Sequence, residues 1–310
     1  SDSGCCSVAD VDDARLAAGR VGIDHHVFDF TELFESEVVA PYVEDHRRGR
    51  TPNPCIECNR QLKFGALLHR ARRLGFDALA TGHHARVMER AGRLRLLRGV
   101  DVAKDQSYVL SMLRADELAR VALPVGHYTK DEVRDHARRL GMDCASKPDS
   151  QDVCFIEAAP GRRGFLADRV TLHPGELVDA ESGAVVGHVP AVELITVGQR
   201  RGLGVAVDGR RRFALSIDVE RGRVIVGHED AVTARRVDLE RVTWADDALE
   251  ASSRALAQTS AHGAVAACSW EGTGVVFDTP QRLVAPGQTV ALYDATDPDV
   301  VLGAGLAARR

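Results

Sequence analysis

Two cysteines in a proline-stiffened turn constrain this chain more than any other feature. Residues 51–59 have the sequence TPNPCIECN and place Cys55 and Cys58 three positions apart. Apolar residues then recur at helical spacing as far as Gly75, which predicts an amphipathic helix that opens at Asn59. The pair is therefore expected at or just before a helix N-terminus, where unpaired backbone N–H groups stabilise a thiolate.

A third thiol, Cys154, lies far downstream in the run DSQDVCF at residues 149–155. A zinc ribbon would need a second C-x-x-C pair, which the sequence lacks. Two interpretations stay open from the residues alone. Three thiolates, at Cys55, Cys58 and Cys154, could hold a [4Fe–4S] cluster with one open iron site. Alternatively, one thiol could carry a transferable sulfur as a persulfide that a second thiol resolves. For the other cysteines considered, packing as small apolar side chains is the preferred interpretation: Cys5, Cys144 and Cys268.

Composition limits the class of protein. The chain has 310 residues, 45% of them hydrophobic and 27% charged, which is enough for two or three globular domains. A net charge of −5 argues against a protein that coats nucleic acid non-specifically. The sequence contains no apolar run of the ~20 residues that a membrane span needs, and its first residues do not resemble a secretory signal. We therefore expect a cytoplasmic protein without a membrane partner.

The order of the expected elements divides the chain into two kinds of structure. The first half alternates helix and strand, which indicates a mostly parallel sheet that binds ligands at the carboxyl ends of its strands. From about Val170, short alternating strands replace the helical pattern, as in small β-barrels or sandwiches. The expected helices lie near residues 11–21, after Thr31, at 59–74 and at 129–140. The expected strands lie at residues 25–30, 76–82, 176–179, 194–197, 213–218, 223–226, 265–270, 274–277 and 289–293.

Three further segments combine chemistry-bearing residues. His83 follows a predicted strand in ATGHH, so it is expected above the sheet. The run KDQS at residues 104–107 precedes a short apolar helix, of which Asp105 or Ser107 could be the N-cap. A glycine-bounded basic loop contains Gln199, Arg200 and Arg201, whose donors suit phosphate oxygens.

Taken together and in this order, the motifs closely resemble those of the bacterial tRNA-specific 2-thiouridylases. They are TPNPCxxCN, ATGHH, KDQSY, DSQDVCF and TVGQRRGLG, and the resemblance continues to PGQ at residues 286–288. It implies a Rossmann-like adenine-nucleotide alpha-hydrolase domain of the PP-loop type, followed by two small β-barrel domains. The expected boundaries are residues 1–165, 166–233 and 234–310.

The resemblance implies a tRNA-uridine 2-sulfurtransferase that acts on the wobble uridine of tRNAs for lysine, glutamate and glutamine. ATP, with Mg²⁺, would adenylate the uracil O2, and a cysteine persulfide would then deliver sulfur to C2. A sulfur-carrier protein or a cysteine desulfurase would be the donor, and the enzyme is expected to be a monomer. By position, Cys154 matches the persulfide-bearing cysteine and Cys58 the nucleophile that resolves it, so a Cys58–Cys154 disulfide is expected during turnover.

Other residues match the family's binding positions. Gly82 matches a nucleotide contact. The expected contacts with tRNA or its target base are Asn53, Pro54, Cys55, His83, Lys104, Asp105, Gln106, Gln288 and the basic-aromatic position at Ser260 and Ala261.

The sequence also departs from the family pattern. Many members have Asp at the position of Cys55, where it is a proposed general acid/base, and Ser260 and Ala261 replace the usual basic-aromatic pair. The family's SGGxDS pyrophosphate loop has no counterpart in these residues, so we expect a domain without its first strand, and no ATP hydrolysis by the 310 residues alone. The alternative interpretation is a non-catalytic remnant that binds RNA or an iron–sulfur cluster.

Overall fold

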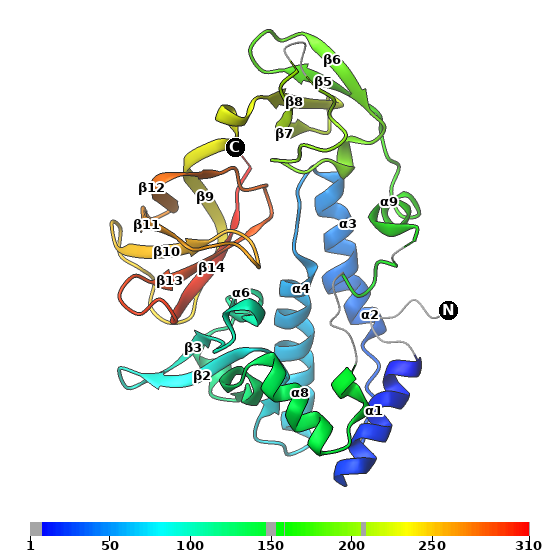
Figure 1. The fold of residues 1–310 in the computed structure, drawn as a ribbon, viewed down its shortest axis with the longest axis vertical. Coiled ribbons are helices and arrows are strands. Elements are labelled where there is room, and N and C mark those ends of the chain that lie inside the picture. Colours follow the sequence, from blue (N-terminus) through cyan, green and yellow to red (C-terminus); the bar gives the residue numbers. More distant parts are fainter. Residues whose placement is uncertain (1–7, 147–152, 158, 206–208, 310) are drawn as a thin grey trace.

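The computed structural model describes residues 8–146, 153–157, 159–205 and 209–309. Three parts follow one another along the chain (Figure 1): a mainly helical part, a four-stranded sheet and a closed six-stranded barrel. Residues 149–152 of the DSQDVCF run, together with Cys5, lie outside the described residues. Within the described ranges, no helix has the length and apolar character needed to cross a bilayer.

Two long helices form the centre of the first part and run along the long axis of the molecule (Figure 1). One consists of α2 (Thr31–Phe34), the π-helix η1 (Glu35–Val39) and α3 (Ala40–Arg47). The other consists of α4 (Pro54–Glu57), the π-helix η2 (Cys58–Leu67) and α5 (Leu68–Arg73). The second helix begins five residues before the predicted start at Asn59, because Pro54 already has helical geometry. It ends as predicted before Gly75, whose φ of +90° suits glycine.

The remaining elements of this part are short. The helix α1 (Val8–Val21) precedes Gly22 as predicted. A two-stranded parallel sheet joins β1 (Leu79–Ala80) to β4 (Val121–Ala122). The hairpin of β2 (Ala85–Arg90) and β3 (Arg93–Arg98) was not predicted. The other segments are η3 (Val102–Lys104), α6 (Ser107–Leu110), α7 (Ala115–Leu118), η4 (Pro124–His127), α8 (Lys130–Arg139), η5 (Asp143–Ser146) and α9 (Gly161–Ala167).

Two strand predictions need correction in this part. The predicted strand at 25–30 is wrong: these residues have no regular structure, and no described strand pairs with them. A strand needs a neighbouring strand to satisfy its backbone groups. Thr31 does not cap the next helix with its side chain; its N–H instead donates to Asp29 Oδ1 at 2.8 Å. The predicted strand at 76–82 is reduced to β1.

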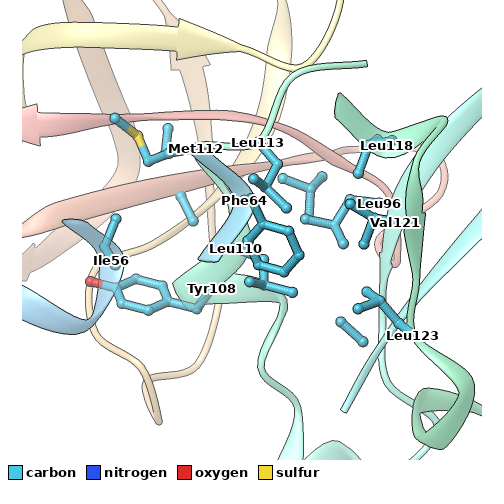
Figure 2. Close-up of a cluster of buried hydrophobic side chains, with 14 of the residues drawn as sticks. Ile56, Phe64, Leu96, Tyr108, Leu110, Met112, Leu113, Leu118, Val121 and Leu123 are labelled. Carbon is cyan, nitrogen blue, oxygen red and sulfur yellow. The ribbon is translucent and has the colours of Figure 1, made fainter. Parts of the chain in front are cut away.

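A single apolar core connects the first part to the C-terminal barrel (Figure 2). Ile56 and Phe64 from the cysteine helix pack with Tyr108 and Leu110, all no more than 2% exposed. The same cluster includes Ala291, Tyr293, Val301 and Ala304 of the barrel. The buried Tyr108 hydroxyl donates to the carbonyl of Thr289 at 2.8 Å, which avoids the cost of an unpaired polar group. The barrel therefore helps to support the cysteine helix.

The central part is a sheet with the order β6-β5-β8-β7, in which β5 and β8 are parallel. Its strands are β5 (Gly175–Asp179), β6 (Val185–Val189), β7 (Phe213–Asp218) and β8 (Arg223–Gly227). The hairpin between β7 and β8 is as predicted, but the strand at 194–197 is wrong. A 3₁₀ turn, η6 (Val192–Leu194), precedes a turn in which the Thr196 N–H donates to Gln199 Oε1 at 3.1 Å. This local bond replaces a sheet ladder.

The C-terminal part closes as a barrel with the order β10-β11-β12-β9-β14-β13. Its interior contains Trp270, Phe277 and Leu292, and Trp244 contacts Trp270 edge-on at 5.0 Å between ring centroids. The 3₁₀ turn η7 (Glu229–Val232) precedes it. The strands are β9 (Thr233–Trp244), β10 (Arg254–Gln258), β11 (Ala266–Trp270), β12 (Gly274–Arg282), β13 (Thr289–Asp294) and β14 (Val301–Ala307). The predicted fold class, α/β followed by all-β, is confirmed.

Candidate active site

Asn53 and Pro54 build the turn that carries the cysteine pair. Asn53 Oδ1 accepts a hydrogen bond from the backbone N–H of Cys55 at 3.1 Å, and so caps the helix. Pro54 occupies the first helical position, where a missing N–H costs nothing. Pro54 and Ile56 are buried, whereas Cys55 between them is exposed. The sequence therefore sets one thiol at the surface of the first helical turn.

Cys58 begins the π-helix η2, one turn after Cys55. It is half-buried and lies in the wall of a cavity of about 780 Å³. Phe30, Phe34 and Leu62 line the same cavity and pack around Cys58. A cavity of this size suits a small-molecule or nucleoside ligand, and π-helical turns often occur at functional sites. Cys58 thus lies in the wall of a largely apolar cavity that is partly open to solvent, where its sulfur could meet a substrate.

Cys154 reaches the same region through its neighbour. It is exposed in a short turn in which the Ile156 N–H donates to the Val153 carbonyl at 3.0 Å. The next residue, Phe155, packs edge-on against Phe34, with ring centroids 5.5 Å apart, and lines the cavity that contains Cys58. The aromatic anchor therefore places the turn of Cys154 beside the cavity that contains Cys58, although the two cysteines are almost a hundred positions apart in sequence.

Two features considered from the sequence are not formed in this structure. No disulfide joins the cysteines of the described residues, so the expected Cys58–Cys154 bond is absent. Among the same residues, no three side chains of His, Cys, Asp or Glu come together as a metal site. Cys55, Cys58 and Cys154 therefore do not fit a three-thiolate cluster as they lie here.

All three parts of the protein meet at Thr51, directly before the cysteine turn. Its N–H donates to the Pro286 carbonyl at 2.7 Å, and its own carbonyl accepts from Gln288 Nε2 at 2.5 Å. Its hydroxyl donates to Thr196 Oγ1 of the central part at 3.4 Å. Gln288, a sequence-predicted tRNA contact, thus also anchors the turn, and both the barrel and the turn at Thr196 of the central part fix the position of the site.

The end of strand β1 opens toward the solvent at Gly82. A methyl group added at Gly82 would meet no atom within 4 Å, so a ligand can approach the backbone there. The neighbouring His83 is instead buried, and its Nδ1 lies 2.7 Å from Thr81 Oγ1. Burial, followed by the positive charge of Lys63, lowers the pKa of His83 to about 4. His83 is therefore a neutral imidazole at physiological pH.

His83 and His46 together predict a loss of stability in mild acid. Burial is the main reason that the pKa of each lies near 4, below the ordinary value of 6.5. Between pH 6.5 and 4 these histidines bind protons in the unfolded chain but not in the folded chain. The unfolding free energy therefore decreases as the pH falls, by on the order of 2 kcal/mol for each residue. Urea unfolding at pH 7 and pH 5 measures this, and His83→Gln should reduce the difference. His69→Gln is the control, because His69 is exposed. If the unfolding free energy changed with pH by the same amount in His83→Gln and His69→Gln, the prediction would be contradicted.

Asp105 is fully engaged in the fold. Its carboxylate accepts from the backbone N–H groups of Gly99 and Ser107, from the Ser107 hydroxyl and from Arg98 Nη1, all at 2.8–3.0 Å. Arg98 also stacks over the ring of Tyr293 at 3.8 Å. The N-cap of helix α6 is Gln106, so the expectation that Asp105 or Ser107 is the N-cap is wrong. Asp105 instead accepts from the N–H of Ser107, the first helical residue, and ties this helix to Arg98 and the barrel.

The neighbours of Asp105 are arranged around the ATGHH segment. Gln106 Oε1 accepts from the His84 N–H at 2.9 Å, and the Gln106 N–H donates to the His84 carbonyl at the same distance. Lys104 ends the turn η3 and is half-buried. The KDQS run is thus joined to the end of β1, where Gly82 lies.

The remaining predicted contacts lie on loops of the two β-rich parts. Ser260 is exposed, and its carbonyl and that of Ala261 accept from Gln258 Nε2. Arg200 and Arg201 are exposed, whereas Gln199 is half-buried and donates to the Arg201 carbonyl at 2.9 Å. The structure does not bring these loops into the cavity that contains Cys58.

Two residues that shape the site, Lys63 and Arg98, could not be identified from the sequence. Lys63 lies on the cysteine helix and lines the cavity with Cys58, but a lysine within an amphipathic helix carries no distinguishing signal. Arg98 links Asp105 to the barrel, because Arg98 Nη2 also donates to Gln258 Oε1 at 2.8 Å. Its partners are 7 and 160 positions away in sequence. Only the fold could reveal it.

Comparison with known protein families covers nearly the whole chain. Residues 1–158 match the family model described as the tRNA methyl transferase HUP domain, and residues 163–228 match the tRNA methyl transferase PRC-barrel domain. Residues 235–307 match the aminomethyltransferase beta-barrel domain.

Three similar proteins from different bacteria share the same name. The tRNA-specific 2-thiouridylase MnmA of Saccharopolyspora erythraea is 43% identical over 98% of this chain and 86% of its own length. The protein of that name from Thermobifida fusca is 45% identical over 97% of this chain and 82% of its own length. The one from Heliobacterium modesticaldum is 41% identical over the whole of this chain and 82% of its own length. The chain belongs to the tRNA-specific 2-thiouridylase family.

Proposed function

We propose that this protein catalyses the ATP-dependent 2-thiolation of the wobble uridine in tRNAs for lysine, glutamate and glutamine. The observation that carries the proposal is the cavity shared by Cys58 and Phe155, the neighbour of Cys154. A sulfur relay needs two thiols that can meet beside a reactive carbon, and a cavity of about 780 Å³ leaves room for one nucleoside.

The first step activates the uracil. Attack of the uracil O2 on the α-phosphate of ATP forms an O-adenylyl group and releases pyrophosphate, which turns a poor leaving group into AMP. We expect ATP to enter with Mg²⁺ and its nucleotide to lie against Gly82, where the backbone is open. His83, neutral because burial lowers its pKa to about 4, can donate or accept a hydrogen bond there without adding a charge.

The second step transfers sulfur. The terminal sulfur of a Cys154 persulfide attacks C2, and AMP leaves with the original oxygen. The Cys58 thiolate then attacks Cys154 Sγ, so the C2-bound sulfur leaves as the 2-thiouridine and a Cys58–Cys154 disulfide forms. An external dithiol returns two electrons before the next cycle. The persulfide sulfur would come from a sulfur-carrier protein or directly from a cysteine desulfurase.

Contacts with tRNA are proposed for residues of the cysteine turn, for the segments around Gly82 and for loops of the two β-rich parts, all outside the cavity wall itself. The first group is the cysteine turn, with Asn53, Pro54 and Cys55. The second group lies around the nucleotide position proposed at Gly82 and consists of His83, Lys104 and Gln106. Asp105 would act through this segment, since its own oxygens are engaged. More distant contacts are proposed at Gln199, Arg200, Arg201, Ser260, Ala261 and Gln288.

The proposal includes the organisation of these 310 residues. A catalytic part at residues 1–165, a central part at 166–233 and a C-terminal part at 234–310 would act together as a cytoplasmic monomer. The anchoring of Thr51 by all three parts supports this, because separating them would release the cysteine turn.

The complete gene provides the direct test. Deleting it should remove 2-thiouridine from the three tRNAs, measured by mass spectrometry of tRNA digests, and a plasmid copy should restore it. Normal 2-thiouridine in the deletion strain would overturn the proposal. Unmodified tRNA in a complemented strain would instead favour a protein that binds RNA without catalysis.

A further inference from the structure

The proposed relay uses Cys58 and Cys154 and gives no task to Cys55. Cys55 and Cys58 are three positions apart in one helix, and Glu57 and Cys58 both have αR geometry, with φ of −64° and −59°. Helix rise and radius place Cα atoms at this spacing about 5 Å apart. Disulfides form at Cα separations of roughly 4.4–6.8 Å. The pair is thus within disulfide reach across one turn.

The two thiols differ in accessibility. Cys58 is half-buried in the cavity wall among Phe30, Phe34 and Leu62, whereas Cys55 is exposed. A protein dithiol must bring its own sulfur within bonding distance of the disulfide that it reduces. A Cys55–Cys58 disulfide presents such a target on the exposed first turn of the helix, whereas in a Cys58–Cys154 disulfide the exposed Cys154 is joined to a half-buried sulfur in the cavity wall.

Charge near the pair also permits the exchange. Glu57 lies between the two cysteines in sequence, and its carboxylate pairs with Arg60 at 2.7 Å and with Arg241 at 3.8 Å. These ion pairs offset the negative charge that would otherwise oppose a nearby thiolate. The positive end of the helix dipole acts in the same direction at Cys55, in the first turn.

We propose that the Cys55 thiol returns Cys154 to its reduced form after each sulfur transfer, an inference that rests on the proposed function. The Cys55 thiolate attacks Sγ of Cys58 in the Cys58–Cys154 disulfide. A Cys55–Cys58 bond forms, the Cys58–Cys154 bond breaks, and Cys154 leaves as a thiolate. No net oxidation occurs in this step, and an external protein dithiol later reduces the Cys55–Cys58 disulfide.

The exchange has a consequence for the catalytic cycle. Phe155 is held by Phe34, Tyr42 and Phe165, with ring centroids 5.2–5.6 Å apart, so the turn of Cys154 is anchored at the cavity. A persisting Cys58–Cys154 disulfide would keep Cys154 oxidised and block the next persulfide. Transfer of the disulfide to the cysteine pair frees Cys154 for reloading.

Disulfide mapping tests the exchange without requiring activity. Trypsin releases Cys55 and Cys58 together in residues 51–60 and Cys154 in residues 140–162. A Cys144→Ser background removes the other cysteine of the second peptide. After equilibration in a glutathione redox buffer and acid quenching, we expect an internal disulfide in residues 51–60. In Cys55→Ser, we expect a cross-link between the two peptides.

Turnover provides the second measurement, with the full-length protein, tRNA, ATP, a persulfide donor and thioredoxin as the protein dithiol. In Cys55→Ser, the steady-state rate should fall about tenfold relative to that variant's own first burst of 2-thiouridine, and the cross-linked peptides should accumulate. Cys144→Ser, which alters another exposed cysteine, should match the wild type in both phases.

The outcomes separate this inference from the proposed function. A normal burst and normal turnover in Cys55→Ser, or a wild-type protein that accumulates only the Cys58–Cys154 cross-link, would overturn the inference and leave the thiolation reaction standing. Absence of 2-thiouridine from the wild-type reaction would overturn both.

Discussion

Cys58→Ser and Cys154→Ser are each expected to abolish 2-thiouridine formation by the full-length protein while changing tRNA binding by no more than about 1 kcal/mol. Neither change should disturb the fold much, because Cys154 is exposed and Cys58 is half-buried at a cavity wall. Thiolation is measured by mass spectrometry of tRNA digests, and binding by filter retention of labelled tRNA. Cys144→Ser is the matched control, since Cys144 is also exposed.

The two variants should fail at different steps. Cys154→Ser cannot carry a persulfide, so it should leave the tRNA unattached. Cys58→Ser can still transfer sulfur from Cys154 to C2 but cannot resolve the product. It should therefore accumulate tRNA linked to Cys154 through a disulfide, visible as a protein–RNA band that dithiothreitol removes. Substantial release of thiolated tRNA by either variant in the absence of added dithiol would contradict the relay.

Local sequence signals predicted those elements whose boundaries are set locally. Thr129 and Glu132 form the predicted capping box of α8, and Gly141 ends that helix with a φ of +67°. The strand predictions at 25–30 and 194–197 were wrong because the formation of a strand does not depend on its own sequence alone. An apolar run becomes a strand only where a neighbouring strand supplies its hydrogen bonds, and side chains such as Gln199 can satisfy the backbone instead.

The candidate site shows the same division. The motif order predicts Cys58 and Cys154 as partners, and the aromatic contact between Phe155 and Phe34 places the turn of Cys154 beside the cavity that contains Cys58. The sequence could not distinguish a ligand contact from a structural residue at Asp105, because its most important partner, Arg98, acquires its position from the barrel.

Asp105→Ala is accordingly expected to cost about 3–5 kcal/mol of unfolding free energy, the usual loss when one partner of a buried ion pair is removed. The Asp105 side chain is 6% exposed and that of Arg98 is 18% exposed, so the arginine would remain with little water to replace the carboxylate. The backbone N–H groups of Gly99 and Ser107 would also lose their acceptor. Urea unfolding at pH 7 measures the loss.

A matched control separates burial from charge. Asp116→Ala removes a carboxylate that pairs with Arg114 at 3.4 Å but is 75% exposed, so its cost should stay within about 0.5 kcal/mol. A double-mutant cycle with Arg98→Ala should give a coupling of about 1–3 kcal/mol, because each residue is costly chiefly when the other remains. If Asp105→Ala kept wild-type stability and only weakened tRNA binding, Asp105 would be a contact for RNA. A large loss of stability with strong coupling to Arg98 would establish that Asp105 serves the fold, by fixing the KDQS segment to Arg98 and through it to the barrel.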